Sequence, residues 1–165
     1  MSLKRVVARG VSAAVLIAIP LTIAATASAS GGVTQVRGTL APDTAGVCQR
    51  ALPFETAFVV SGTLEGCWFV EHTTYLHRNH AGGFVATGTE EFHGCVAGTT
   101  RCGSFFTTFK RTARYVGSVE KHGRSHHAID ETLGTEGFVG VDGIINMHDL
   151  STGSRNYKGH LQLSS

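Results

Sequence analysis

The 165-residue sequence lacks any motif whose residue types and spacing select a particular reaction. Its glycine-rich stretch, Gly134-Thr-Glu-Gly-Phe-Val-Gly-Val-Asp-Gly143, has neither the G-x-G-x-x-G pattern of a dinucleotide-binding loop nor the Lys-Ser/Thr ending of a phosphate loop. None of the four cysteines stands in a C-x-x-C pair, which structural zinc sites usually use. No helical periodicity is sustained along the chain, which disfavours a helical fold. We therefore predict no cofactor.

The first 29 residues have the features of a secretory signal peptide. Lys4, Arg5 and Arg9 precede an apolar run from Val11 to Ala25, and the cleavage-type sequence Ala27-Ser28-Ala29 follows. The alternative is an uncleaved anchor, but a spanning helix needs about 20 apolar residues without this small-residue exit. We expect a mature protein that begins near residue 30, is secreted and extracellular, and has no membrane attachment after cleavage.

Export makes disulfides the expected use of an even number of cysteines. Cys95 and Cys102 flank the turn of a predicted hairpin, Gly83 to Val116. Opposite residues in an antiparallel pair have Cα atoms about 4.5–5.5 Å apart, which a disulfide tolerates. This favours a Cys95–Cys102 bond, and Cys48–Cys67 is then the remaining pair.

The mature chain has no excess of basic charge. Cleavage removes three of the 14 Lys and Arg residues, which leaves 11 against 12 acidic residues and a net charge of −1 with neutral histidines. The one basic cluster, Lys110-Arg111-Thr112-Ala113-Arg114, is more typical of a solvated strand face. We predict no nucleic-acid partner. The sequence leaves the oligomeric state open.

The mature chain reads as a meander of β-strands. A first strand is predicted at 33–40, and seven more at 54–65, 67–76, 83–94, 103–116, 125–133, 142–150 and 156–163. Turn-forming residues separate them, including Glu65-Gly66 and Lys121-His-Gly123. Eight sequential antiparallel strands have two unpaired edges unless the sheet closes. We therefore expect an all-β fold, a closed eight-stranded antiparallel up-and-down barrel.

This interpretation divides the chain into three parts: a signal peptide at 1–29, an extended lead-in with the first strand at 30–53, and the barrel domain at 54–165. Within the barrel domain, the glycines of 134–143 predict a strongly bent connection packed against one end of the barrel.

Four glycine-centred segments follow one another in a recognisable order. They are Gly88-Thr-Glu-Glu-Phe92, Gly103-Ser-Phe-Phe106, the stretch 134–143 and Tyr157-Lys-Gly-His-Leu-Gln-Leu163. In this order they resemble a bacterial family of domains of unknown function, similar in fold to the allene oxide cyclase barrel. The resemblance covers roughly 54–163. It implies a closed eight-stranded barrel and a bacterial source, but no established activity and no catalytic residues.

Three pairs of neighbouring polar residues are candidates for the barrel interior: Glu71 with His72, Glu90 with Glu91, and Asp130 with Glu131. If the strands alternate cleanly, one member of each pair points inward. Because burial of an ionised group costs several kcal/mol unless it is paired, such a residue needs a partner or a wet cavity. A structural pair with Arg111 or Arg114 is the favoured interpretation, and a catalytic acid or base is the alternative.

All nine histidines lie in the mature chain, which raises the question of a metal site. His77 and His80 share a loop and could converge. His126 and His127 are adjacent on a strand and therefore point to opposite faces. Because no fixed ligand spacing is present, we predict no metal site.

The expected barrel suggests a secreted protein of unknown function that binds a small hydrophobic ligand in its lumen. The candidate ligand-binding residues are Trp68, Glu71, His72, Glu90, Phe92 and Phe105. One alternative is a cyclase- or isomerase-like enzyme that uses lumenal Glu and His. The other is an extracellular interaction protein with a filled barrel. A lumen packed solid with Phe and Trp68 would exclude the first two.

Overall fold

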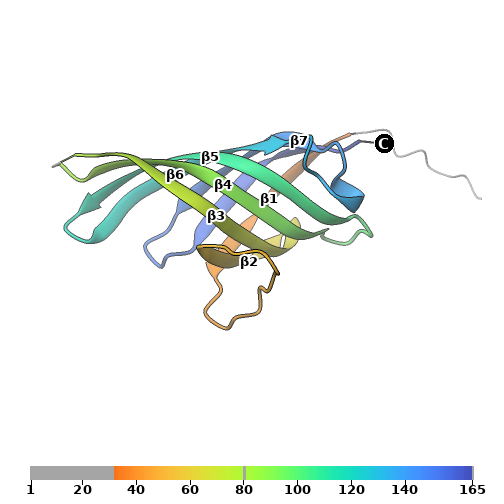
Figure 1. The fold of residues 1–165 in the computed structure, drawn as a ribbon, viewed down its shortest axis with the longest axis horizontal. Helices are drawn as coiled ribbons and strands as arrows, with labels where there is room; N and C mark the ends of the chain where they lie inside the picture. Colours follow the sequence, from red (N-terminus) through yellow and green to blue (C-terminus); the bar gives the residue numbers. More distant parts are fainter. Residues whose placement is uncertain (1–31, 80, 165) are drawn as a thin grey trace, which may run out of the picture.

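The computed structural model describes residues 32–79 and 81–164. The predicted signal peptide lies outside the described residues. The described chain forms eight strands in one closed antiparallel barrel, in which each strand pairs with its sequence neighbours and β1 pairs with β8 (Figure 1). The strands are β1 (Val33–Pro42), β2 (Thr56–Gly62), β3 (Leu64–Arg78), β4 (Gly83–Val96), β5 (Cys102–Val116), β6 (Val119–Asp130), β7 (Asp142–Asp149) and β8 (Arg155–Gln162). The predicted fold class is confirmed.

Two predicted turns are misplaced. The chain reverses at Gly117 and Ser118, and β6 begins at Val119, so the predicted turn at 121–123 lies inside a strand. The turn predicted at 65–66 is replaced by one centred on Thr63, after Gly62. Gly117 and Gly62 both have positive φ, 63° and 121°, which glycine adopts without a side-chain penalty. The β3–β4 and β5–β6 hairpins extend far from one end of the barrel (Figure 1).

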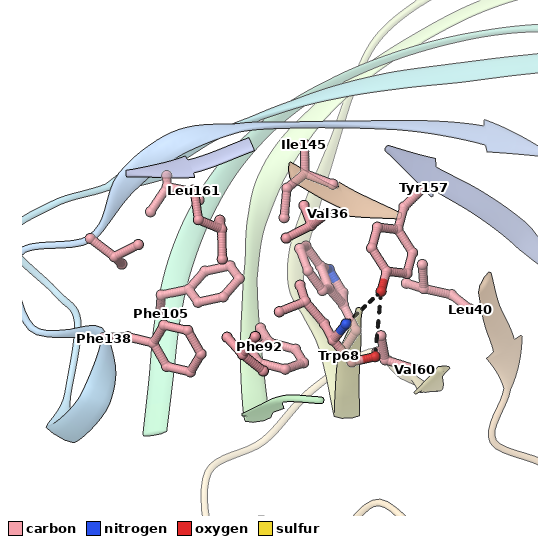
Figure 2. Packing of buried hydrophobic residues seen from close by; sticks show 14 of the residues in the cluster. Val36, Leu40, Val60, Trp68, Phe92, Phe105, Phe138, Ile145, Tyr157 and Leu161 are labelled. Atoms are coloured by element: carbon pink, nitrogen blue, oxygen red, sulfur yellow. Dashed lines mark hydrogen bonds between the residues drawn. The ribbon is translucent and has the colours of Figure 1, made fainter. Parts of the chain in front are cut away.

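The opposite end of the lumen is filled by aromatic side chains. Trp68, Phe92 and Phe105 come from inward-facing positions of β3, β4 and β5, and each is almost fully buried. A short 3-10 helix, η1 (Glu136–Phe138), places Phe138 against them, with ring centroids 5.9 Å from Phe92 and 5.3 Å from Phe105 (Figure 2). The predicted bent connection at 134–143 is therefore confirmed, and it closes this end of the barrel. We call the four rings of Trp68, Phe92, Phe105 and Phe138 the aromatic plug.

Both predicted disulfides are confirmed. Cys95 lies directly opposite Cys102 in the β4–β5 register, and Cys48 bonds to Cys67. The second bond anchors the loop at 43–55 to the outside of β3. There Cys48, Ala57 and Phe69 form a small cluster separate from the lumen. Two disulfides are typical of proteins from an oxidising compartment.

Candidate functional site

The lumen has a polar end, opposite to the aromatic plug. A cavity of about 180 Å³ lies there. Its lining residues are Glu55, Thr56, Val70, Thr73, Tyr75, Phe84, Ala86, Glu90, Phe109, Arg111, Ser125 and Arg155. Because the apolar end is filled by side chains, this cavity is the part of the lumen that is open to a small molecule.

Three buried polar side chains form a chain beside this cavity. Ser125 and His127 are two residues apart on β6, so both point into the lumen. The Ser125 Oγ lies 2.8 Å from Nε2 of His127. Oε2 of Glu90, on β4, lies 3.0 Å from Nδ1 of His127, although the N–H direction is off the line to this oxygen. The indole N–H of Trp68 donates to the same carboxylate oxygen.

Aromatic rings fix the orientation of His127. Phe109 lies directly opposite His127 in the β5–β6 register and stacks on its ring, with centroids 5.7 Å apart. Trp68 meets the same ring edge-on, also at 5.7 Å. The imidazole is thus held between two rings while both of its nitrogens face polar atoms.

Glu90 is an ionised group inside the barrel. Burial raises the pKa of its carboxyl group, but the adjacent His127 ring, the charge of Arg155 and the N–H of Trp68 together outweigh burial and hold that pKa below its ordinary value. Nη1 of Arg155 lies 3.6 Å from Oε1 of Glu90. The carboxylate is therefore compensated, which is the condition for keeping a charge in a barrel core.

A second charged cluster borders the cavity. Arg111 donates hydrogen bonds to Glu120 at 2.7 Å and to Asp149 at 2.8 Å, and Arg155 forms an ion pair with Asp149 at 3.1 Å. Burial raises the pKa of Asp149, but the charges of Arg155 and Arg111 outweigh it and lower the pKa overall. The sequence paired an inward carboxylate with Arg111 or Arg114, but the inward Glu90 pairs with Arg155, whereas Arg111 pairs with Glu120 and Asp149, which were not among the predicted carboxylates.

Four of the six candidate ligand-binding residues come together in the lumen: Trp68, Glu90, Phe92 and Phe105. Of these, Glu90 lines the cavity, and the three aromatic residues fill the space behind it.

Glu71 and His72 lie outside the lumen. The β3–β4 register shifts between Val70 and His72, so clean alternation fails at this β-bulge. Glu71 bonds to Arg50 of the outer loop at 2.9 Å, and the His72 side chain is 71% exposed. The expectation that one of the two points inward is therefore wrong.

The other predicted polar pairs have different outcomes. Glu91 points outward, opposite to Glu90, and pairs with Arg50 and His93. The pair Asp130 and Glu131 stands where β6 ends, so strand alternation does not apply to it. Asp130 accepts hydrogen bonds from Thr132 in the following turn. His80 lies outside the described residues.

The sequence patterns did not identify Ser125 or Arg155 as site residues. They also did not assign the His127 side chain to the inner or the outer face of its strand. The burial of 122–129 alternates strictly, so Ser125, His127 and Ile129 share the inner face. The sequence pattern contained this period of two, but both faces are polar enough that neither was marked as the inside.

The cavity adjoins an aromatic rim at the barrel mouth. A surface hollow of about 590 Å³ shares Tyr75, Phe84 and Arg111 with the cavity and also contacts Leu76 and Tyr115. Tyr75 is 71% exposed and Leu76 58% exposed. Large apolar side chains held open to solvent beside a cavity are typical of a binding site.

Within the described part of the chain, no three His, Cys, Asp or Glu side chains converge to hold a metal ion. Across residues 32–79 and 81–164, no helix has the length and apolar character needed to cross a membrane. No protein-family model matches the sequence, and no curated protein matches it.

Proposed function

We propose that this protein binds a small amphipathic molecule at the polar end of its lumen. The observation that carries the proposal is the cavity in which Glu90, Ser125 and Arg155 meet beneath an aromatic rim. Its volume of about 180 Å³ equals about six water molecules of liquid volume. Ligand pockets are usually about 300–1,000 Å³, so only one end of a ligand enters, and the rest lies against Tyr75 and Phe84.

The polarity of the cavity determines which end enters. A purely hydrophobic group would strip water from the Glu90 carboxylate and Arg155 without replacing its hydrogen bonds, which is unfavourable. A hydroxyl or amide can donate to Glu90 and accept from Arg155 or Ser125. We therefore refine the expected ligand from hydrophobic to amphipathic, with its polar group inside and its apolar part at the rim.

The test compares two small compounds that differ by one hydroxyl, p-cresol and toluene. Trp68 is the single tryptophan of the chain and donates to Glu90, so its fluorescence reports on the cavity. We expect p-cresol to change this emission with at least tenfold higher affinity than toluene, and Tyr75→Ala at the rim to weaken p-cresol binding. Thr108→Ala, on the outer face of β5, is the matched control and leaves it unchanged.

Native mass spectrometry of protein purified from its own culture medium would identify the natural ligand class. If no compound co-purifies and neither compound changes the Trp68 emission, lumenal binding is refuted. The filled apolar end would then favour an interaction role on the outside of the barrel.

A second function is favoured by the order Ser125–His127–Glu90. An oxygen nucleophile, an imidazole and a carboxylate in this sequence of contacts are the arrangement of serine hydrolases. In the reaction, Ser125 Oγ attacks a small acyl ester as its proton passes to Nε2 of His127. The leaving alcohol takes that proton, and water then releases the acid and restores Ser125.

The hydrolase alternative is tested with a fluorophosphonate, which reacts covalently with activated serines. Labelling of Ser125 that is lost in His127→Gln supports it. Absence of any label at Ser125, with p-cresol binding intact, leaves a binding protein. A third proposal is a cyclase- or isomerase-like enzyme that uses Glu90 with His127. We also propose that the chain belongs to the bacterial family with the allene oxide cyclase-like fold, and the closed eight-stranded barrel supports this relationship.

A further inference from the structure

One side of the barrel carries a row of basic and amide side chains that crosses five strands. The strand registers pair Lys110 with His126, His126 with Asn146, Asn146 with Lys158, and Lys158 with Arg37. Because neighbouring strands are about 4.8 Å apart, the row spans about 19 Å from β5 to β1. The row is continuous in space although its members are widely scattered in sequence.

A second row runs parallel to the first, two residues further along each strand. It contains Arg124, opposite His148, and Asn156, opposite both His148 and Thr39. We call the surface formed by these two rows the basic face; its residues are Arg37, Thr39, Lys110, Thr112, Arg124, His126, Asn146, His148, Asn156 and Lys158. Side chains from both rows line one surface hollow of about 860 Å³.

The basic face contains no carboxylate. The outward carboxylates on β6 and β7, Asp130 and Asp142, lie at the far ends of their strands. Among the described residues, none of the four cations of the face forms an ion pair. Unpaired, solvent-exposed cations keep their full charge for a partner.

The barrel separates charges that the sequence intermingles. The acidic residues Glu90, Glu120 and Asp149 come from β4, β6 and β7 but point into the lumen, where arginines neutralise them. The cations of β5–β8 and β1 that point outward have no such partners. A mature chain with a predicted net charge of −1 therefore presents one strongly positive side.

We propose that the basic face binds an anionic polysaccharide, that is, a linear chain of sugars bearing sulfate, phosphate or carboxylate groups. The four cations supply the attraction. Asn146, Asn156 and the neighbouring hydroxyls supply donors and acceptors for sugar hydroxyl groups. The row follows the barrel wall across the strands, so a thin flexible chain can contact all of it.

The composition of the face favours a sugar polymer over single-stranded nucleic acid. Proteins that bind single strands stack the bases on aromatic rings, at about 1–3 kcal/mol per base. The ten residues of the basic face include no Phe, Tyr or Trp, and Tyr157, which also lines the hollow, is only 4% exposed and offers no open ring for stacking. The binding energy of the face must therefore come from charges and hydrogen bonds. A polyanion without nucleobases supplies both kinds of contact.

The test measures binding of dextran sulfate, with unsulfated dextran as the neutral probe. If four cations displace counterions as they do on single strands, raising salt from about 50 to 200 mM weakens binding about fiftyfold. Lys110→Glu with Lys158→Glu reverses two charges of the row, and we expect at least a tenfold loss. Both side chains are exposed and outside the lumen, so the fold and p-cresol binding are retained.

The matched control is Arg78→Glu with Lys121→Glu, which changes the net charge equally at exposed positions away from the face. It should alter dextran sulfate binding by less than twofold. The proposal is overturned if dextran sulfate does not bind at about 50 mM salt, if both double variants weaken binding equally, or if unsulfated dextran binds as tightly. Tighter binding of polyuridylate than of dextran sulfate would replace the polysaccharide by nucleic acid.

Discussion

Replacing Glu90 by Gln removes the negative charge that lies beside both His127 and Arg155 in the lumen while keeping the side-chain shape. Glu90 is 1% exposed, so bulk water screens its charge poorly. Breaking a buried ion pair by removing one partner costs about 3–5 kcal/mol. The amide oxygen of the introduced glutamine still accepts from Trp68, and Arg155 keeps its bond to Asp149. The loss should therefore fall near the lower end, at about 3 kcal/mol.

For a domain of this size, each kcal/mol lowers Tm by about 3–5 °C, so Glu90→Gln should melt about 10–15 °C below the wild type. Trp68 is the single tryptophan and contacts Glu90, so its emission follows unfolding at this site. The assay is thermal and urea unfolding of both proteins by Trp68 fluorescence at pH 7.

The same variant tests the ionisation of Glu90. Because its folded pKa lies below the ordinary value of 4.5, its contribution to stability is complete above about pH 4.5 and is lost as pH falls through the folded pKa. The wild type should therefore lose its advantage over Glu90→Gln only in acid. The reasoning would be refuted if the difference in the free energy of unfolding between the two proteins stayed constant from pH 7 to pH 3. It would also be refuted if loss of that difference, followed by Trp68 emission, occurred between pH 5 and 7.

Three further changes test the fold. Phe138→Ala empties the plug and should lower the free energy of unfolding by about 3–5 kcal/mol; a loss below about 1 kcal/mol would contradict the packing. Gly38→Ala places a Cβ 2.0 Å from a backbone oxygen of β2 and should prevent closure of the barrel, measured as loss of soluble folded protein. The control Gly98→Ala meets no atom within 4 Å and, at φ 73°, should lower the free energy of unfolding by only about 1 kcal/mol. Joint replacement of Cys48 and Cys67 by Ala should cost about 3 kcal/mol and expose the loop at 43–55 to protease; unchanged cleavage would show that the bond does not anchor it.

Local residue patterns were enough to predict the number of strands and their order. Alternating strand-forming residues and glycine-rich turns follow directly from backbone preferences, and eight antiparallel strands leave edges that only closure removes. The Cys95–Cys102 bond followed because both residues flank one turn, so their contact depends on nearby residues only. The same argument identified the bent segment that carries Phe138.

The tertiary structure decided which face of each strand is the inside. A period of two is unchanged when every side chain is exchanged between faces, so the sequence could not choose between His126 and His127. The bulge after Val70, which keeps Glu71 and His72 out of the lumen, depends on the pairing of β3 with β4. The contact of Glu90 with Arg155 and the row from Lys110 to Arg37 join strands far apart in sequence. Such contacts exist only once the barrel closes, because closure fixes the register of strands that no local pattern relates.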